Sequence, residues 1–267
     1  MRAFMQSLDV VRQAKLLVVK VGTSVLRDSG SVVSRDRVEA VASEIAAVRR
    51  AGKKIVLVTS GAIGTGMDVM GMKKRPTELS RLQAAAAIGQ GRLIQWYTAR
   101  FEQEGFHAAQ ILLTREDIED RRRSMNAKGT LLTLLENGVV PIVNENDTVS
   151  VEEIRYGDND VLSAHVSVLI GADLLVILSD VDSFSGPETP VRVITEVTSE
   201  LEKCARGSAH ETSTGGMKTK FDAAKEVMKS GIPMVFMDGR GRESLTRLVV
   251  RAEERGTWFI PKHKLRS

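Results

Sequence analysis

Short runs of hydrophobic residues alternate along the chain with longer stretches in which apolar residues recur at helical spacing. Runs rich in valine, isoleucine and leucine predict buried β-strands at residues 16–21, 55–59, 108–113, 139–143, 174–178 and 232–237. Helical spacing predicts helices at residues 35–51, 79–103, 124–136, 161–170 and 219–228. A glycine-rich turn is expected at residues 60–66, directly after the second strand.

This alternation of strands and helices, joined by short connections, predicts an α/β fold. Strands that are apolar throughout are typical of parallel sheets buried on both faces. We therefore expect a three-layer αβα sandwich with an open, mostly parallel sheet. No internal repeat and no linker rich in proline, glycine or serine divides the sequence, so residues 1–267 are expected to form a single domain.

The composition is that of an ordinary globular protein, with 42% hydrophobic and 27% charged residues. No apolar run approaches the ~20 residues of a membrane-spanning helix, and the N-terminus lacks the apolar core of a signal peptide. The single cysteine, Cys204, excludes a disulfide framework. A net charge of +4 with only 4% aromatic residues provides little positive charge and few stacking surfaces for binding nucleic acid. We expect a cytoplasmic protein that binds neither membranes nor nucleic acids.

Small, polar and charged residues follow the predicted strands. Ligands of open α/β sheets bind beyond the carboxyl ends of the strands, so these residues are expected to meet along one edge of the sheet. The set comprises Lys20 inside the first strand, Gly22, Ser60, Gly61, Asn144, Asp147, Asn159, Asp160, Ser179, Asp180 and residues 214–220 (TGGMKTK).

Several of these features also have a purely structural interpretation. A lysine within an apolar strand needs a charged partner, so Lys20 indicates either a buried ion pair or a phosphate ligand. Glycines such as those after Thr214 are typical of turns, although backbone N–H groups at the start of a helix also suit phosphate. Residues 157–160 (GDND) are equally typical of a helix cap.

Several common catalytic motifs do not occur in the sequence. It contains no G-x-x-x-x-G-K-[ST] loop, no G-x-G-x-x-G dinucleotide fingerprint and no G-x-S-x-G nucleophile elbow. Cys204 and the four histidines do not stand at the spacings of a zinc site. Zinc chemistry and hydrolase triads therefore have no support.

The polar segments, taken in order, resemble those of the amino acid kinase family. The resemblance rests on residues 18–24 (VVKVGTS), 58–63 (VTSGAI), 144–147 (NEND), 157–160 (GDND) and 215–220 (GGMKTK), and it covers nearly the whole chain. It is strongest to the members that act on glutamate. The resemblance implies ATP-dependent phosphorylation of the γ-carboxylate of L-glutamate, the first step of proline biosynthesis.

The family pattern also implies a role for each matching residue. Lys20 and Lys220 are expected to flank the transferred phosphoryl group, and Asp160 to orient both lysines. Glutamate is expected to contact Ser60, Gly61, Asn144, Asp147 and Asn159, with Asp147 at its ammonium group. The nucleotide is expected to contact Lys20, Gly22, Ser179, Asp180, Thr214, Gly215, Gly216, Met217, Lys218, Thr219 and Lys220.

Further expectations concern cofactors and partners. The resemblance implies Mg²⁺ bound with ATP and held largely by phosphate oxygens, with no metal site made by the protein alone. It also implies a homo-oligomer, either a dimer or a tetramer, and leaves open whether proline is a feedback inhibitor. The alternatives are a related kinase for another carboxylate, carbamate or a nucleoside phosphate, and a nucleotide or amino-acid sensor without catalysis.

The sequence departs from the family pattern in two places. Bacterial relatives usually carry a C-terminal module of the RNA-modification type, and its lack here predicts a kinase-only form. Residues 183–187 (SFSGP) replace the Gly-Leu-Tyr-Thr stretch that commonly follows Asp182, and the segment up to Glu196 is short. Because that segment approaches the base and ribose in the family, we expect weaker discrimination between ATP and GTP.

Overall fold

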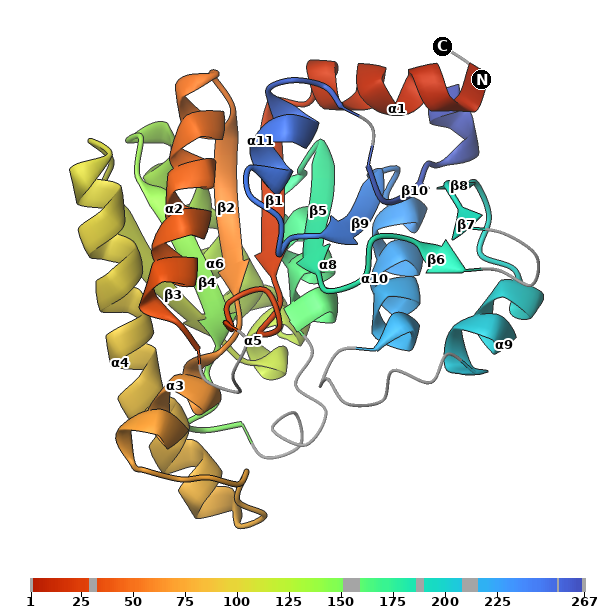
Figure 1. Ribbon diagram of the computed structural model, residues 1–267. Helices are drawn as coiled ribbons and strands as arrows, with labels where there is room; N and C mark the ends of the chain where they lie inside the picture. The colour runs from red at the N-terminus through yellow and green to blue at the C-terminus, as the bar shows by residue number, and fades with distance from the viewer. Residues whose placement is uncertain are drawn as a thin grey trace.

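A mixed β-sheet forms the centre of the molecule (Figure 1). The computed structural model describes residues 2–28, 33–150, 159–185, 190–207, 216–253 and 255–265, and within these ranges eight strands pair in the order β3-β4-β2-β1-β5-β9-β10-β8. Their bounds are β1 (Leu16–Val21), β2 (Lys54–Thr59), β3 (Ala108–Leu113), β4 (Val140–Glu145), β5 (Leu174–Ser179), β8 (Val193–Ile194), β9 (Met234–Asp238) and β10 (Thr257–Phe259).

The first six strands of this order are parallel to one another. Strand β1 pairs in parallel with β2 and β5, which places Lys20 beside Val58 on one side and Ile177 on the other. Strand β10 runs antiparallel to β9. The expected mostly parallel sheet is confirmed, and the carboxyl ends of its central strands lie at one edge.

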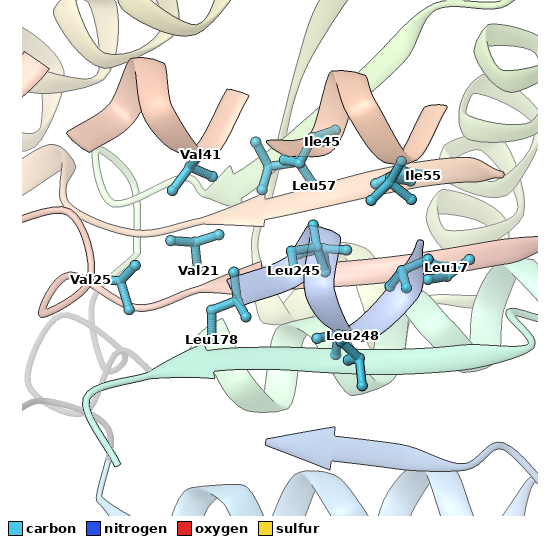
Figure 2. Close-up of a cluster of buried hydrophobic side chains, with 14 of the residues drawn as sticks. Leu17, Val21, Val25, Val41, Ile45, Ile55, Leu57, Leu178, Leu245 and Leu248 are labelled. Carbon is cyan, nitrogen blue, oxygen red and sulfur yellow. The ribbon is translucent and has the colours of Figure 1, made fainter. Parts of the chain in front are cut away.

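Helices cover both faces of the sheet (Figure 1). On one face, Val19 and Val21 of β1 pack with residues of α2, α4 and α11, and Figure 2 shows Val21 with Val41, Ile45 and Leu245. On the other face, β1 contributes Val18 to a cluster with α6, α8 and α10. These two clusters make the three-layer αβα sandwich that the sequence predicts.

The helices are α1 (Arg2–Gln13), α2 (Arg35–Arg50), α3 (Ala62–Val69), α4 (Leu79–Gln103), α5 (Arg115–Glu119), α6 (Arg121–Glu136), α8 (Asn159–Ile170), α9 (Ser199–Gly207), α10 (Met217–Lys229) and α11 (Ser244–Val249), with a short 3₁₀ turn at Lys262–Leu265. The short strands β6 (Phe184–Ser185) and β7 (Pro190–Val191) pair with each other beside the main sheet. None of the helices in the described ranges is both long and apolar enough to cross a membrane.

The predicted glycine-rich turn at residues 60–66 is wrong over most of its length. Only Ser60 and Gly61 precede helix α3, which begins at Ala62 and contains Gly64 and Gly66. A Cβ atom on Gly66 would lie 1.7 Å from the carbonyl oxygen of Ala85 in α4. Glycine is therefore required at this position because α3 and α4 pack backbone to backbone.

Candidate functional site

A buried carboxylate lies between two buried lysines at the carboxyl edge of the sheet. Asp160 Oδ1 is 2.5 Å from Lys20 Nζ, and Asp160 Oδ2 is 3.2 Å from Lys220 Nζ. The side chain of Asp160 is fully buried, and those of Lys20 and Lys220 are 7% and 3% exposed. The structure thus brings together the three residues that were predicted to be catalytic.

Three different elements supply this cluster. Lys20 lies near the end of the central strand β1, whose side chains beyond the first are all buried. Asp160 lies in the first turn of α8, and Lys220 in the first turn of α10, which packs against α8. The Thr219 hydroxyl lies 3.1 Å from Asp160 Oδ2 and 2.8 Å from the carbonyl oxygen of Gly216, which fixes the start of α10 to the cluster.

The two lysines control the ionisation of Asp160. Burial alone would raise the pKa of this carboxyl, but the positive charges of Lys20 and Lys220 and their hydrogen bonds hold the pKa well below its usual range. Asp160 therefore stays ionised at neutral pH. One carboxylate and two ammonium groups leave one net positive charge in the cluster, as suits a site that attracts phosphate.

A cavity of about 620 Å³ opens beside this cluster. Its wall includes all five residues that were predicted to bind glutamate, namely Ser60, Gly61, Asn144, Asp147 and Asn159. Asn159 joins the cavity to the cluster, because its neighbour in the chain is Asp160. The sequence therefore predicts correctly which residues come together here, while their roles stay predictions.

Helix α3 begins at the wall of the same cavity. Its N-cap residue, Gly61, has a φ of 105°, a left-handed conformation that favours glycine, and both Gly61 and Ala62 line the cavity. The first backbone N–H groups of a helix have no partner within the helix and suit a negatively charged group. This end of α3 therefore offers a binding site for a carboxylate or a phosphate.

The predicted nucleotide-binding residues are only partly brought to this edge. Ser179 ends β5, and its hydroxyl lies 3.2 Å from the carboxylate of Asp180. Gly216 caps α10, and Met217 begins it. Thr214 and Gly215 lie outside the described residues, as do residues 186–189 of the short segment after Asp182, so the expectations for these positions stay predictions.

The structure adds a detail at two of the predicted nucleotide-binding residues. The N–H of Gly22 donates to the carbonyl oxygen of Leu178 at 3.0 Å and extends the pairing of β1 with β5, so this N–H is not available to a phosphate. The side chain of Lys218 is 63% exposed and lies 4.0 Å from Asp222 one turn along α10. The nucleotide contacts of both residues stay predictions.

The sequence analysis missed polar and charged residues that also belong to this site. Gln90 of α4 is buried and accepts a hydrogen bond of 2.7 Å from Asn144 Nδ2. Arg27, Lys73 and Arg75 line the cavity as well. The basic run at residues 73–75 was a visible signal in the sequence, but a charge run is usually solvated surface and gave no reason to place it here.

The side chains at this site also indicate how a metal ion would be held. Within the described residues, no group of three or more His, Cys, Asp and Glu side chains could hold one. Both oxygens of Asp160 face lysines. A cationic pocket of this kind fits a Mg²⁺ ion that is bound by the oxygens of a triphosphate.

Comparison with known proteins gives a family and several relatives. Residues 15–238 match the model of the amino acid kinase family. A glutamate 5-kinase of Burkholderia mallei is 47% identical over 261 residues, covering 95% of this chain and 70% of the relative. A glutamate 5-kinase of Moorella thermoacetica is 46% identical over 257 residues, covering 94% of this chain and 68% of the relative.

The fold is also found in solved structures. Carbamate kinase from Giardia lamblia bound to AMP-PNP superposes with a TM-score of 0.66 and is 17% identical, and the match covers 94% of this chain and 99% of that one. A sequence identity of 17% supports a shared fold and nothing more specific.

Proposed function

Because this chain belongs to the amino acid kinase family, we propose that it transfers the γ-phosphoryl group of ATP to the γ-carboxylate of L-glutamate. The observation that carries the proposal is the Lys20–Asp160–Lys220 cluster beside the cavity that holds all five predicted glutamate-binding residues. Relatives named glutamate 5-kinase that are 42–47% identical over almost the whole chain support the choice of acceptor.

The acceptor needs no general base. A glutamate side chain has a reference pKa of about 4.3 and is ionised at neutral pH. One oxygen of its γ-carboxylate forms a bond to the γ-phosphorus, and the bond from that phosphorus to the bridging oxygen breaks, so that ADP leaves with the electron pair. The products are L-glutamyl 5-phosphate and ADP.

The main obstacle is the repulsion between an anionic acceptor and an anionic triphosphate. Phosphoryl transfer is accelerated mainly by positioning and by positive charge along the line of reaction. Lys20 and Lys220 supply that charge, and Asp160 keeps both ammonium groups in place between the two substrates. Bound Mg²⁺ supplies further neutralisation of the triphosphate.

The polar wall of the cavity accounts for binding of the amino acid. Asp147 offers a carboxylate to the α-ammonium group, and a charged hydrogen bond contributes more than a neutral one. The N-terminal end of α3 and the guanidinium groups of Arg27 and Arg75 offer positive charge to the substrate carboxylates.

Release of ADP from purified enzyme, with and without an acceptor, tests the proposal. We expect release with L-glutamate, and far less with L-aspartate or carbamate at the same concentration. Release that does not depend on glutamate, or that is faster with carbamate, would contradict the proposed acceptor.

A further inference from the structure

A chain of buried side-chain amides connects helix α4 with the wall of the cavity. Asn144 Nδ2 donates to Gln90 Oε1 at 2.7 Å, and Asn159 Nδ2 donates to Asn144 Oδ1 at 3.0 Å. Asn159 Nδ2 also lies 2.9 Å from Ser60 Oγ. Gln90, Asn144 and Asn159 are 8%, 1% and 8% exposed, so water competes little for these groups.

Two backbone groups fix the direction of this amide chain. The N–H of Glu145 donates to Asn144 Oδ1 at 2.9 Å, so the NH₂ group of Asn144 faces Gln90. The carbonyl oxygen of Thr59 can only accept, and it lies 2.7 Å from Asn159 Nδ2. The side-chain oxygen of Gln90 must therefore be the acceptor at the far end.

This direction decides what the chain presents to a ligand. The two hydrogens of Asn159 Nδ2 are shared among three acceptors, the carbonyl oxygen of Thr59, Asn144 Oδ1 and Ser60 Oγ. Toward this NH₂ group Ser60 Oγ can only accept, which leaves the Ser60 hydroxyl hydrogen to be donated into the cavity. The wall thus offers the Ser60 hydroxyl as a donor to a substrate carboxylate.

We propose that Gln90 is a positioning residue for the acceptor amino acid, acting through Asn144 and Asn159 on the Ser60 hydroxyl. Gln90 itself is not among the residues that line the cavity, so it acts without touching the substrate. If its oxygen is removed, the NH₂ group of Asn144 loses its acceptor, and the Asn144 side chain is then held, among the described residues, only by the N–H of Glu145, so its contact with Asn159 loosens. The proposal rests on the proposed function, because it takes glutamate as the acceptor.

The variant Gln90→Met keeps the length of the side chain and removes the accepting oxygen. We expect the KM for glutamate to rise by about 5- to 10-fold, as fits the loss of one hydrogen bond, with KM for ATP and kcat nearly unchanged. Gln95→Met is the matched control, because Gln95 is exposed on the same helix. An equal effect of both variants, or an equal rise in the KM for ATP, would overturn the proposal.

A double-variant cycle separates positioning from general loss of structure. If Gln90 acts through the Ser60 hydroxyl, Gln90→Met should change the KM for glutamate by less than about 2-fold in an enzyme that already carries Ser60→Ala. A full additional 5- to 10-fold rise in the double variant would show that Gln90 does not act through Ser60.

The amide chain is also tested without turnover. In ¹⁵N-resolved NMR spectra of the whole protein, the side-chain NH₂ signals of Asn144 and Asn159 should shift in Gln90→Met and stay in place in Gln95→Met. Signals that do not move would overturn the positioning role whatever the kinetics. Shifted signals in an enzyme that shows no glutamate-dependent ADP release would instead leave the amide chain intact and contradict the proposed function.

Discussion

Asp160 is fully buried, and its two oxygens lie 2.5 Å and 3.2 Å from the ammonium groups of Lys20 and Lys220. In the proposed function, each of these residues serves both the stability of the fold and the reaction. Removing one lysine would then take away charge from the path of the phosphoryl group. It also leaves a buried carboxylate with less compensation, and a broken buried ion pair is strongly destabilising.

The variant Lys20→Met should lose activity and stability together. We expect kcat to fall by about 10²–10³-fold, the usual loss for one preorganised contact in the transition state. The free energy of unfolding should fall by about 3–5 kcal/mol. Steady-state kinetics well below the melting temperature and urea denaturation measure the two effects separately.

The double variant Lys20→Met/Asp160→Asn tests this interpretation of stability. The single variant keeps the buried pair of Asp160 with Lys220, whereas the double variant leaves the buried Lys220 without this carboxylate, so it should lose further unfolding free energy while kcat stays low. A single variant with nearly wild-type turnover would remove Lys20 from the reaction.

Asp147 belongs to the wall of the cavity and not to the cluster. The α-ammonium group of glutamate keeps its charge during transfer, so a contact with it binds ground state and transition state alike and appears in KM. Asp147→Ala should raise the KM for glutamate about 10-fold or more, at roughly 1.4 kcal/mol per decade. The KM for ATP serves as the internal control. An unchanged KM for glutamate would exclude Asp147 from the amino-acid site.

At the scale of elements, helix α4 holds one wall of the site through its close contact with α3. A Cβ atom on Gly89 would lie 1.8 Å from the carbonyl oxygen of Ala62, the first residue of α3. Gly89 therefore lets α4 approach the cavity and places the next residue, Gln90, beside Asn144. A Cβ atom on Gly91, two residues further along, would meet no atom of another element within 4 Å.

This difference predicts opposite effects of the same substitution within one helix. Gly89→Ala should lower the free energy of unfolding by about 1–3 kcal/mol, because the backbone of α3 must move. Gly91→Ala should raise it by about 0.5–1 kcal/mol, because alanine favours the helix. Urea denaturation of both variants checks the signs. Equal effects would contradict the backbone contact between α3 and α4.

Elements with a strong apolar period could be predicted from the sequence. Helix α4 and strands β1 and β3 have the predicted bounds, and the other predicted elements differ by a few residues at most. Helix α6 begins three residues before the predicted Ser124, because the Asp120 side chain accepts from the N–H of Arg123 and caps it. The glycines of residues 60–66 are typical of a turn, but in helix α3 they allow close packing against α4 and do not reverse the chain.

The site could be predicted where strand order alone determines it. Ser60 and Asp147 follow parallel strands, and Asn144 lies near the end of one, so the topology brings them to one edge. Gln90 could not be predicted, since a single polar residue in a long helix gives no signal until its partner is known. The hydrogen bond from the N–H of Gly22 to Leu178 depends on the register of β1 against β5, so it could not be predicted from the sequence either.

At the scale of the whole molecule, the fold places the cluster of Lys20, Asp160 and Lys220 at the carboxyl edge of the sheet, while α1 lies at the other edge (Figure 1). Stability should therefore depend on pH through Asp160. Its folded pKa lies below the unfolded value of 3.8, so its ionised form stabilises the fold above that pH. This contribution is lost as the pH falls from about 4 toward the folded pKa.

Urea denaturation at several pH values between 5 and 2 measures this dependence. The unfolding free energy of the wild type should fall more steeply below about pH 4 than that of Lys20→Met/Asp160→Asn, which lacks the shifted carboxyl. Parallel curves for the two proteins would show that Asp160 is not the group responsible.

The most direct test of the account is detection of the phosphorylated product itself. Hydroxylamine converts an acyl phosphate into a stable hydroxamate, which mass spectrometry identifies. With ATP, Mg²⁺ and L-glutamate, the wild type should form γ-glutamyl hydroxamate in step with ADP, and Lys220→Met should form it about 10²–10³-fold more slowly. ADP release without hydroxamate, or equal rates for the two proteins, would contradict the claim that this cluster transfers phosphate to glutamate.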